Sequence, residues 1–150
     1  MSEAAIRKIE PSEAEAVFEL EKACFHASWP LEEIKYELNE NPCSILLGVY
    51  ENETLVGYID FMITFDSATI NRICVEKEKR NKGYAMLLLQ EMEKACKSQA
   101  DPVEFITLEV RESNSSAINL YHKAGYSDVT IKKMYYSDGE NAIYMMRSLL

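Results

Sequence analysis

Segment 79–95, KRNKGYAMLLLQEMEKA, joins a polar run containing one glycine to an apolar-periodic stretch without a break. Basic groups at a helix start oppose the positive end of the helix dipole, so Arg80 and Lys82 are unexpected there unless an anion joins them. The first N–H groups of a helix lack partners, and Gly83 would let a phosphate approach the backbone closely. Segment 80–86 is therefore typical of a pyrophosphate site, and a plain polar turn that starts a helix is the alternative.

The elements that would position this segment follow a mixed order, β-α-α-β-β-β-α-β-α-β-β, read from periods of two and 3.6 residues. The order predicts one α/β domain over residues 1–150, with about four helices packed on a mixed central sheet of about seven strands. The expected strands are 5–10, 44–50, 53–65, 68–75, 103–110, 128–136 and 141–149, and the expected helices are 11–25, 28–38, 84–97 and 113–125.

Several residue pairs predict where these elements start, turn and end. Ser12 followed by Glu15 is a capping-box signature for the first helix. Ser113 or Asn114 would cap the last helix, and Gly125 would end it. The turn chemistry of ENET at 51–54 and SDGE at 137–140 predicts two β-hairpins.

Composition and charge exclude several classes of function. A formal net charge of −9 argues against general nucleic-acid binding, which needs a basic face. No apolar run approaches the ~20 residues of a membrane helix, and the polar N-terminus is unlike a signal peptide. The cysteines form no CxxC pair, which favours reduced thiols in a cytoplasmic protein. Two histidines, His26 and His122, give little support to a metal site.

Three separated motifs carry a family resemblance. RNKGYA at 80–85 matches the Gln/Arg-x-x-Gly-x-Gly/Ala motif of the GNAT acetyltransferase superfamily. TLEVRESNSSAINLYHKAGY at 107–126 and KKMYYSDGENAIYM at 132–145 resemble the RimI family, bacterial N-acetyltransferases that modify a small-subunit ribosomal protein. The resemblance covers nearly the full chain. It implies the GNAT fold, acetyl-CoA as co-substrate and no metal.

The resemblance also implies roles for individual residues. Glu109 corresponds to the family's proton acceptor and Tyr121 to its proton donor. The backbone of a splayed strand would hold the acetyl and pantetheine groups, the following helix start would hold the pyrophosphate, and the next loop would add one contact. The implied cofactor-binding residues are Ile73, Cys74, Val75, Arg80, Asn81, Lys82, Gly83, Tyr84, Ala85, Met86 and Asn114.

Three residues depart from the family pattern. Cys74 stands where alanine is frequent, and Asn81 stands where a basic residue is frequent. Met134 replaces a smaller or more polar residue before the tyrosine pair. Because that hairpin helps to shape the acceptor groove, Met134 bears on acceptor specificity.

The implied acid and base are chemically reasonable, and each has a structural alternative. Burial near the end of an apolar strand would raise the pKa of Glu109 toward that of a useful base, but an ion pair with Arg111 or Arg7 is also open. A phenol of pKa ~10 would protonate a thiolate of pKa ~8.5 at a small cost. Tyr121 would equally serve as a core tyrosine beside Leu120.

The acceptor predicted from the resemblance is the α-amine of a protein N-terminus, in a small-subunit ribosomal protein. An α-amine has a pKa of ~7.7–8.0, against ~10.4 for lysine, so it loses its proton more easily. Trp29, Tyr135 and Tyr136 are candidates for holding the peptide, and Trp29 is equally a candidate core anchor. A lysine or polyamine acceptor, and a CoA-binding module without turnover, remain alternatives. A monomer or weak homo-oligomer is expected.

Overall fold

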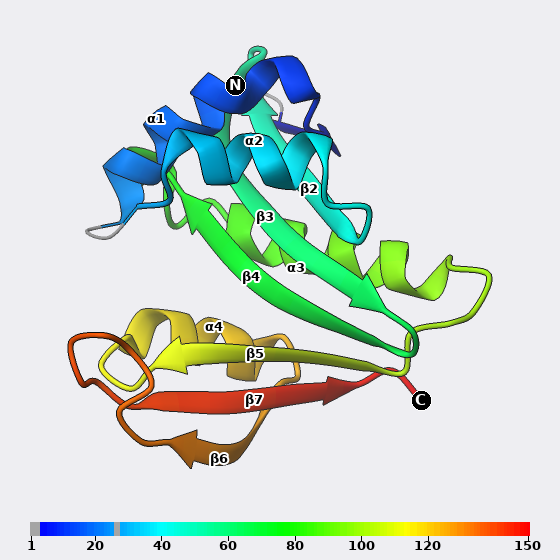
Figure 1. Ribbon diagram of the computed structural model, residues 1–150, viewed down its shortest axis with the longest axis vertical. Coiled ribbons are helices and arrows are strands. Elements are labelled where there is room, and N and C mark those ends of the chain that lie inside the picture. The colour runs from blue at the N-terminus through cyan, green and yellow to red at the C-terminus, as the bar shows by residue number, and fades with distance from the viewer. Residues whose placement is uncertain (1–3, 26–27) are drawn as a thin grey trace.

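The computed structural model describes residues 4–25 and 28–150, in which the elements follow the predicted order (Figure 1). These residues form a seven-stranded sheet, ordered β1-β2-β3-β4-β5-β7-β6, and four α-helices. The strands are β1 (Ala4–Lys8), β2 (Ser44–Glu51), β3 (Thr54–Thr64), β4 (Ser67–Val75), β5 (Phe105–Arg111), β6 (Ser127–Lys132) and β7 (Ala142–Ser148). The helices are α1 (Ala14–Cys24), α2 (Leu31–Asn39), α3 (Tyr84–Lys97) and α4 (Ser115–Lys123).

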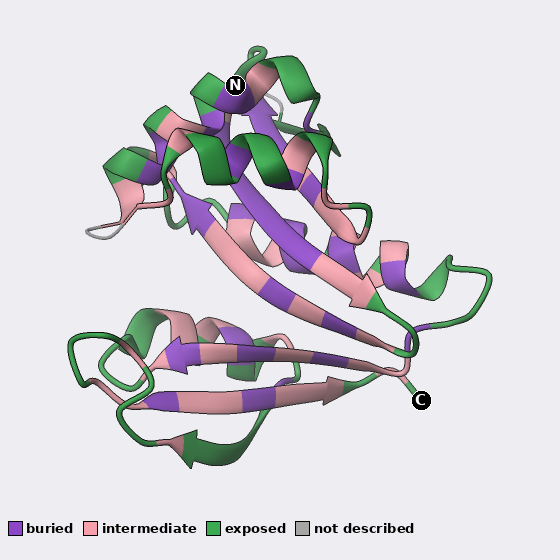
Figure 2. Cartoon of the chain, in the orientation of Figure 1, coloured by how far each residue is buried: buried purple, intermediate pink, exposed green. Residues whose placement is uncertain are grey.

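Two hydrophobic cores lie on opposite faces of the sheet. Helices α1 and α2 cover one face, and α3 lies across the other (Figure 1). Neighbouring residues of β3 serve both cores, since Tyr58 packs on the α1–α2 side and Ile59 on the α3 side. Figure 2 shows β3 buried over most of its length and the edge strand β6 exposed. The centre of the sheet is thus a rigid support for the segments at its edges.

Strands β4 and β5 run parallel but pair over only three residues each. Ser67–Thr69 pairs with Phe105–Thr107, and beyond this point the strands diverge (Figure 1). In the part of the chain that the structure describes, residues 70–75 of β4 therefore have no ladder partner on the β5 side. Unpaired backbone N–H and C=O groups need other partners, so these facing edges are open to an extended ligand.

Three local predictions are confirmed, one for the β2–β3 turn and two for the ends of α4. Asn52 and Glu53 have φ values of +50° and +67°, as a type I′ turn between β2 and β3 requires. The Asn114 Oδ1 accepts a hydrogen bond of 3.2 Å from the Ala117 N–H, so Asn114 caps α4. Gly125 follows this helix with a φ of +97°.

Two local predictions were wrong. A 3-10 turn, Pro11–Glu13, precedes α1, and the Glu13 carboxylate accepts the Glu10 N–H at 2.7 Å. Capping therefore occurs two residues before the predicted Ser12–Glu15 pair.

The second wrong prediction concerns β6, which ends at Lys132 and not at residue 136. Met134 has a φ of +54°, which breaks the strand, and the Tyr136 N–H bonds to the Glu140 carbonyl at 3.2 Å. Tyr135 therefore lies in a loop over residues 133–141. The direction of its side chain there does not follow the alternation of a strand.

Three further observations concern metals, membranes and thiols. Within residues 4–25 and 28–150, no three His, Cys, Asp or Glu side chains are arranged to hold a metal ion. His26 lies outside the described residues. No helix in the same ranges is both long and apolar enough to cross a membrane. All four cysteines are free thiols.

A buried acid in β3 leads to a stability prediction. Asp60 is fully buried, and burial together with the neighbouring Glu37 carboxylate raises its pKa to about 8. The unfolded chain releases this proton near pH ~3.9, so stability falls as the pH rises from about 4 to about 8. Asp60→Asn should therefore raise the free energy of unfolding relative to wild type, by up to about 4 kcal/mol at pH 7.

Urea unfolding of Asp60→Asn and wild type at pH 5 and pH 8 would measure this effect. The difference between the two proteins should be larger at pH 8. Asp66→Asn, which removes a charge from an exposed turn, is the control and should show no such trend. A difference that is the same at both pH values would contradict the assignment.

Candidate active site

The start of α3 is open in front of its first turn. Gly83 is the N-cap, with a φ of +81°, and a Cβ added to it would meet no atom of the described residues within 4 Å. No side chain of the residues that the structure describes caps this helix, and Asn81 also has a positive φ of +66°. The Leu87 N–H bonds to the Gly83 carbonyl, whereas the earlier N–H groups of the helix have no such partner among residues 4–25 and 28–150. This arrangement leaves donors and space for an anion.

The basic residues of this turn are tied to the sheet. Glu51, at the end of β2, accepts ion pairs from Lys79 at 2.9 Å and Lys82 at 3.1 Å, and a hydrogen bond from the Tyr84 hydroxyl. The Tyr84 hydrogen bond, followed by the two lysines, lowers the pKa of Glu51 to about 2. Glu51 therefore fixes the turn, and sequence reasoning missed it because nothing local links residue 51 to residue 82.

The last residues of β4 direct backbone groups toward the diverging side. Cys74 lies opposite Tyr58 in the β3–β4 ladder, and its side chain is buried in the α1–α2 core. The Val75 carbonyl instead accepts a hydrogen bond of 2.9 Å from the Arg80 Nε. Because the direction of the backbone N–H and C=O groups alternates along a strand, those of Ile73 and Val75 both point to the open side of β4.

Glu109 projects from β5 on the same face of the sheet as the α1–α2 core. Its neighbours Leu108 and Val110 are buried in the core on the α3 side, so strand alternation places Glu109 opposite them. Its side chain is only 19% exposed, and its Oε2 pairs with the Lys132 Nζ at 2.9 Å. The Tyr135 hydroxyl lies 3.5 Å from its Oε1.

The ion pair of Glu109 involves neither of the predicted arginines. Arg111 pairs with Asp138 and Glu140, and Arg7 pairs with Glu13. Lys132 reaches Glu109 because β6 lies beyond β7 and runs antiparallel to it, in a register that sequence spacing does not reveal.

Tyr121 lies in the core on the α3 side, and it is 5% exposed. Its ring meets the Tyr126 ring with centroids 5.7 Å apart. Burial, with a smaller contribution from Tyr136, raises the pKa of Tyr121. Within the described residues its hydroxyl makes no hydrogen bond, so its proton is available for donation to a ligand. Glu109 and Tyr121 thus lie on opposite faces of β5.

Trp29 is attached to a buried carboxylate. Its backbone N–H donates to the Glu21 Oε1 at 2.9 Å, and the Arg72 guanidinium lies 5.0 Å from the centroid of its ring. Glu21 is fully buried and also accepts from Tyr58 and Arg72. These contacts support the core-anchor interpretation of Trp29. Sequence reasoning missed Glu21, although its place four residues after Val17 puts it on the buried face of α1.

The tyrosine pair of the β6–β7 loop lies near Glu109. Tyr135 is 48% exposed and meets Tyr136 edge to face, with ring centroids 5.0 Å apart. The Arg111 guanidinium lies 4.0 Å from the Tyr136 ring. Figure 1 shows this loop at the end of the molecule where β4 and β5 terminate. The N-terminal end of α2 lies at the same end of the molecule.

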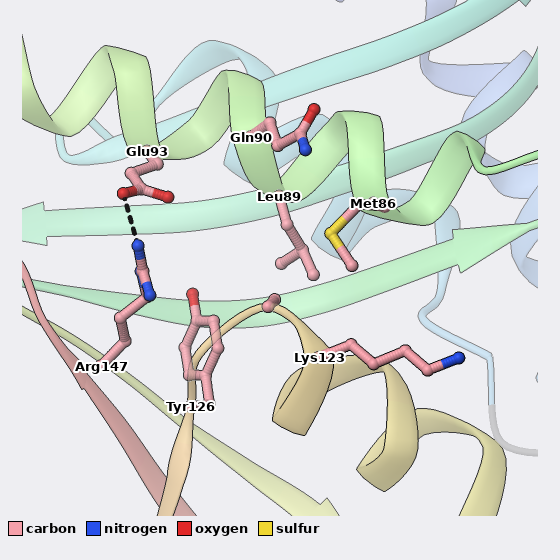
Figure 3. A pocket seen from close by; sticks show the side chains of 8 residues that line it. Met86, Leu89, Gln90, Glu93, Lys123, Tyr126 and Arg147 are labelled. Atoms are coloured by element: carbon pink, nitrogen blue, oxygen red, sulfur yellow. Dashed lines mark hydrogen bonds and ion pairs between the residues drawn. The ribbon is translucent and has the colours of Figure 1, made fainter.

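A pocket of about 180 Å³ lies between α3 and α4 (Figure 3). Met86 and Lys123 line it on one side, and an ion pair of 2.8 Å between Glu93 and Arg147 lies on the other. Of the predicted site residues, Met86 is the one that lines this pocket. The pocket therefore continues from the first turn of α3 and is separate from Glu109.

Together these features can hold an anionic group at α3 and an extended chain between β4 and β5. Comparison with known proteins gives the family. The acetyltransferase (GNAT) family matches residues 14–126. The ribosomal protein bS18-alanine N-acetyltransferase of Haemophilus influenzae is 32% identical over 144 residues, which cover 93% of this chain and 95% of that protein.

Two further comparisons agree. The N-alpha-acetyltransferase of Saccharolobus solfataricus is 30% identical over 156 residues, covering 96% of this chain and 92% of that protein. The crystal structure of the Escherichia coli ribosomal-protein-S18-alanine N-acetyltransferase has a TM-score of 0.85 and 25% identity, covering 98% of this chain and 94% of that one. The chain belongs to the GNAT family of acetyltransferases and is an N-acetyltransferase of the type to which these relatives belong.

Proposed function

We propose that this enzyme transfers the acetyl group of acetyl-CoA to the α-amine of a protein N-terminus, and that the acceptor is a small-subunit ribosomal protein in the cytoplasm. The observation that carries the proposal is the divergence of β4 and β5, with the Glu109 carboxylate on one face of β5 and the uncommitted Tyr121 hydroxyl on the other. Relatives named for bS18-alanine and N-alpha acetylation support the choice of acceptor.

The residues at the start of α3 suit a pyrophosphate. Uncapped N–H groups, the open space at Gly83 and the nearby cations of Arg80 and Lys82 favour an anion there. Backbone groups of Ile73 and Val75 would hold the pantetheine arm along β4. The set proposed to hold acetyl-CoA is Ile73, Val75, Arg80, Asn81, Lys82, Gly83, Tyr84, Ala85, Met86 and Asn114. Cys74 spaces Ile73 and Val75 along β4, with its backbone groups toward β3 and its side chain in the α1–α2 core.

The side chain of Asn114 retains a donor group for binding acetyl-CoA. Its Oδ1 caps α4, so the side-chain NH₂ is the group left to donate to a ligand.

Acetyl-CoA supplies an activated thioester carbonyl. The lone pair of the acceptor nitrogen attacks that carbon, and the C–N bond forms while the C–S bond breaks. A backbone N–H on the open side of β4, at Ile73 or Val75, would stabilise the carbonyl oxygen as negative charge builds on it. Glu109 takes the proton released from the nitrogen, and Tyr121 gives its proton to the departing sulfur. Solvent then restores both groups.

Burial suits Tyr121 to this role. It keeps the phenol protonated at neutral pH, since the pKa of Tyr121 is raised. A thiolate leaving into the same low-dielectric region also has a raised pKa, so the two proton affinities stay close. The core position of Tyr121 and a role as proton donor are therefore compatible.

The acceptor peptide would lie on the Glu109 face. Tyr135 and Tyr136 would contact it from the β6–β7 loop, and Trp29, held by Glu21, would border it from the segment before α2.

A panel of acceptors tests the proposed function. CoA release would be measured with a lysine-free peptide carrying a free N-terminus, an N-terminally blocked lysine peptide, and spermidine. The free N-terminus should give the highest kcat/KM. A higher value with lysine or spermidine would reject the α-amine, and no turnover with any of them would reject the proposed reaction.

Gly83 provides a prediction on cofactor binding. Gly83→Asn should weaken acetyl-CoA binding at least tenfold, because a side chain would fill the space in front of α3, while asparagine tolerates the positive φ. Gly83→Val should do the same at a greater cost in stability. Isothermal titration calorimetry with acetyl-CoA would measure both.

The matched control is Gly139→Asn. Gly139 has a φ of +89° and equally open surroundings, but it lies in the β6–β7 loop. That variant should bind acetyl-CoA as wild type does. Unchanged affinity in a folded Gly83→Asn protein would show that no group of the cofactor approaches this glycine.

A further inference from the structure

The Glu109 carboxylate is already bound to an ammonium group of the protein itself. The Lys132 Nζ lies 2.9 Å from the Glu109 Oε2, 4.6 Å from the centroid of the Tyr144 ring and 5.4 Å from that of Tyr135. A carboxylate and aromatic faces are the groups that stabilise a cation best. Lys132 is therefore held in one place beside the proposed base, and the hydrogen bond to Glu109 raises its pKa.

A guanidinium and three phenols of the described residues lie around this pair. From β5, the Arg111 guanidinium is bound to Asp138 and Glu140 of the β6–β7 loop. The phenols near the pair are those of Tyr135 and Tyr136 in the same loop and of Tyr144 in β7. The charge that an acceptor meets at Glu109 is thus set chiefly by the pairing with Lys132.

We propose that Lys132 is a specificity-determining residue, whose fixed ammonium favours acceptors that reach Glu109 as neutral amines over acceptors that arrive protonated. The inference deepens the proposed function and rests on it, because it takes Glu109 as the base for the acceptor. An acceptor nitrogen in hydrogen-bond range of Glu109 lies roughly 5 Å from the Lys132 Nζ, since one carboxylate serves both. Repulsion between two ammonium groups at that distance weakens binding on the order of ten- to a hundredfold.

This repulsion separates the two kinds of protein amine. The α-amine and lysine differ by ~2.5 pKa units, so at pH 7 the neutral fraction of an α-amine is about 300 times larger. With Lys132 present, acceptors bind as neutral amines, so the full difference in neutral fraction appears in kcat/KM. Without Lys132, a protonated lysine amine can bind at Glu109, which passes the first proton on to solvent and then takes the second proton, released when the nitrogen attacks. A fixed cation beside the base thereby converts a pKa difference between acceptors into selectivity.

Lys132→Met tests the proposal, because it removes the charge and keeps an unbranched side chain of similar length. Lys132→Arg keeps a cation and is the control. The ratio of kcat/KM at pH 7 for the lysine-free peptide with a free N-terminus against the N-terminally blocked lysine peptide would be measured for each. In Lys132→Met this ratio should fall at least tenfold relative to wild type, and in Lys132→Arg it should stay within about threefold.

The pH dependence of KM provides a second readout that a merely structural role would not change. In wild type, KM for the α-amine should fall as the pH rises through ~8, where the neutral form appears. In Lys132→Met this fall should be flattened. An unchanged ratio, or equal loss of activity on both peptides with an unchanged pH dependence, would overturn the proposal. A wild-type preference for the lysine peptide would reject the proposed acceptor, and that result is read without any variant.

Discussion

Replacing Tyr121 with phenylalanine should lower kcat by about 10²–10⁴-fold and leave the affinity for acetyl-CoA unchanged. The substitution removes one hydroxyl from a ring that is 5% exposed and packed against Tyr126. Since that hydroxyl makes no hydrogen bond within the described residues, its loss should cost little stability. The expected effect is therefore on turnover, through the proton that the departing thiolate needs.

Tyr126→Phe is the matched control for this prediction. Tyr126 is also buried and aromatic, and it contacts Tyr121 directly. Its kcat should stay within a few fold of wild type. Steady-state kinetics, with calorimetry for acetyl-CoA binding, would measure both variants. If Tyr121→Phe kept a near-native kcat, Tyr121 would be a packing residue only.

Replacing Glu109 with glutamine should lower kcat/KM at pH 7 by roughly 10²-fold, because the acceptor nitrogen loses its base. The rate should recover in part as the pH rises, since solvent then supplies neutral amine. For an α-amine this recovery should centre near pH ~8, and for lysine it would centre near ~10.4. A pH–rate profile of both proteins on the lysine-free peptide would measure the effect.

Glu112→Gln is the control for a lost negative charge near the end of β5, because Glu112 is exposed and follows the strand directly. It should leave the profile unchanged. A Glu109→Gln rate equal to wild type at pH 7 would return Glu109 to the role of ion-pair partner for Lys132.

Local sequence signals predicted much of the fold and of the cofactor site. The order of elements, the turn at Asn52 and Glu53, and the cap at Asn114 depend on residues close together in the chain. The same is true of the start of α3, where Gly83 adopts the left-handed conformation that a bare glycine suggests. Such features could be recognised because their physical causes lie within one turn of chain.

The remaining features depend on contacts between distant segments. Lys132 meets Glu109 only because β7 lies between β5 and β6, and Glu51 meets Lys82 only once β2 and α3 have packed. The end of β6 was misplaced because residues 133–136 have the composition of a strand, whereas Met134 turns the chain with a positive φ. Charged residues near the site were therefore predicted by type but not by partner.

The most direct test of the account is the position of the acetyl group on one peptide that carries both a free N-terminus and an internal lysine. The peptide, wild-type enzyme and acetyl-CoA would be incubated at pH 7, and the modified atom would be assigned by fragmentation mass spectrometry. Acetylation of the α-amine in large excess over the lysine is expected at early times. Acetylation chiefly on the lysine would contradict it.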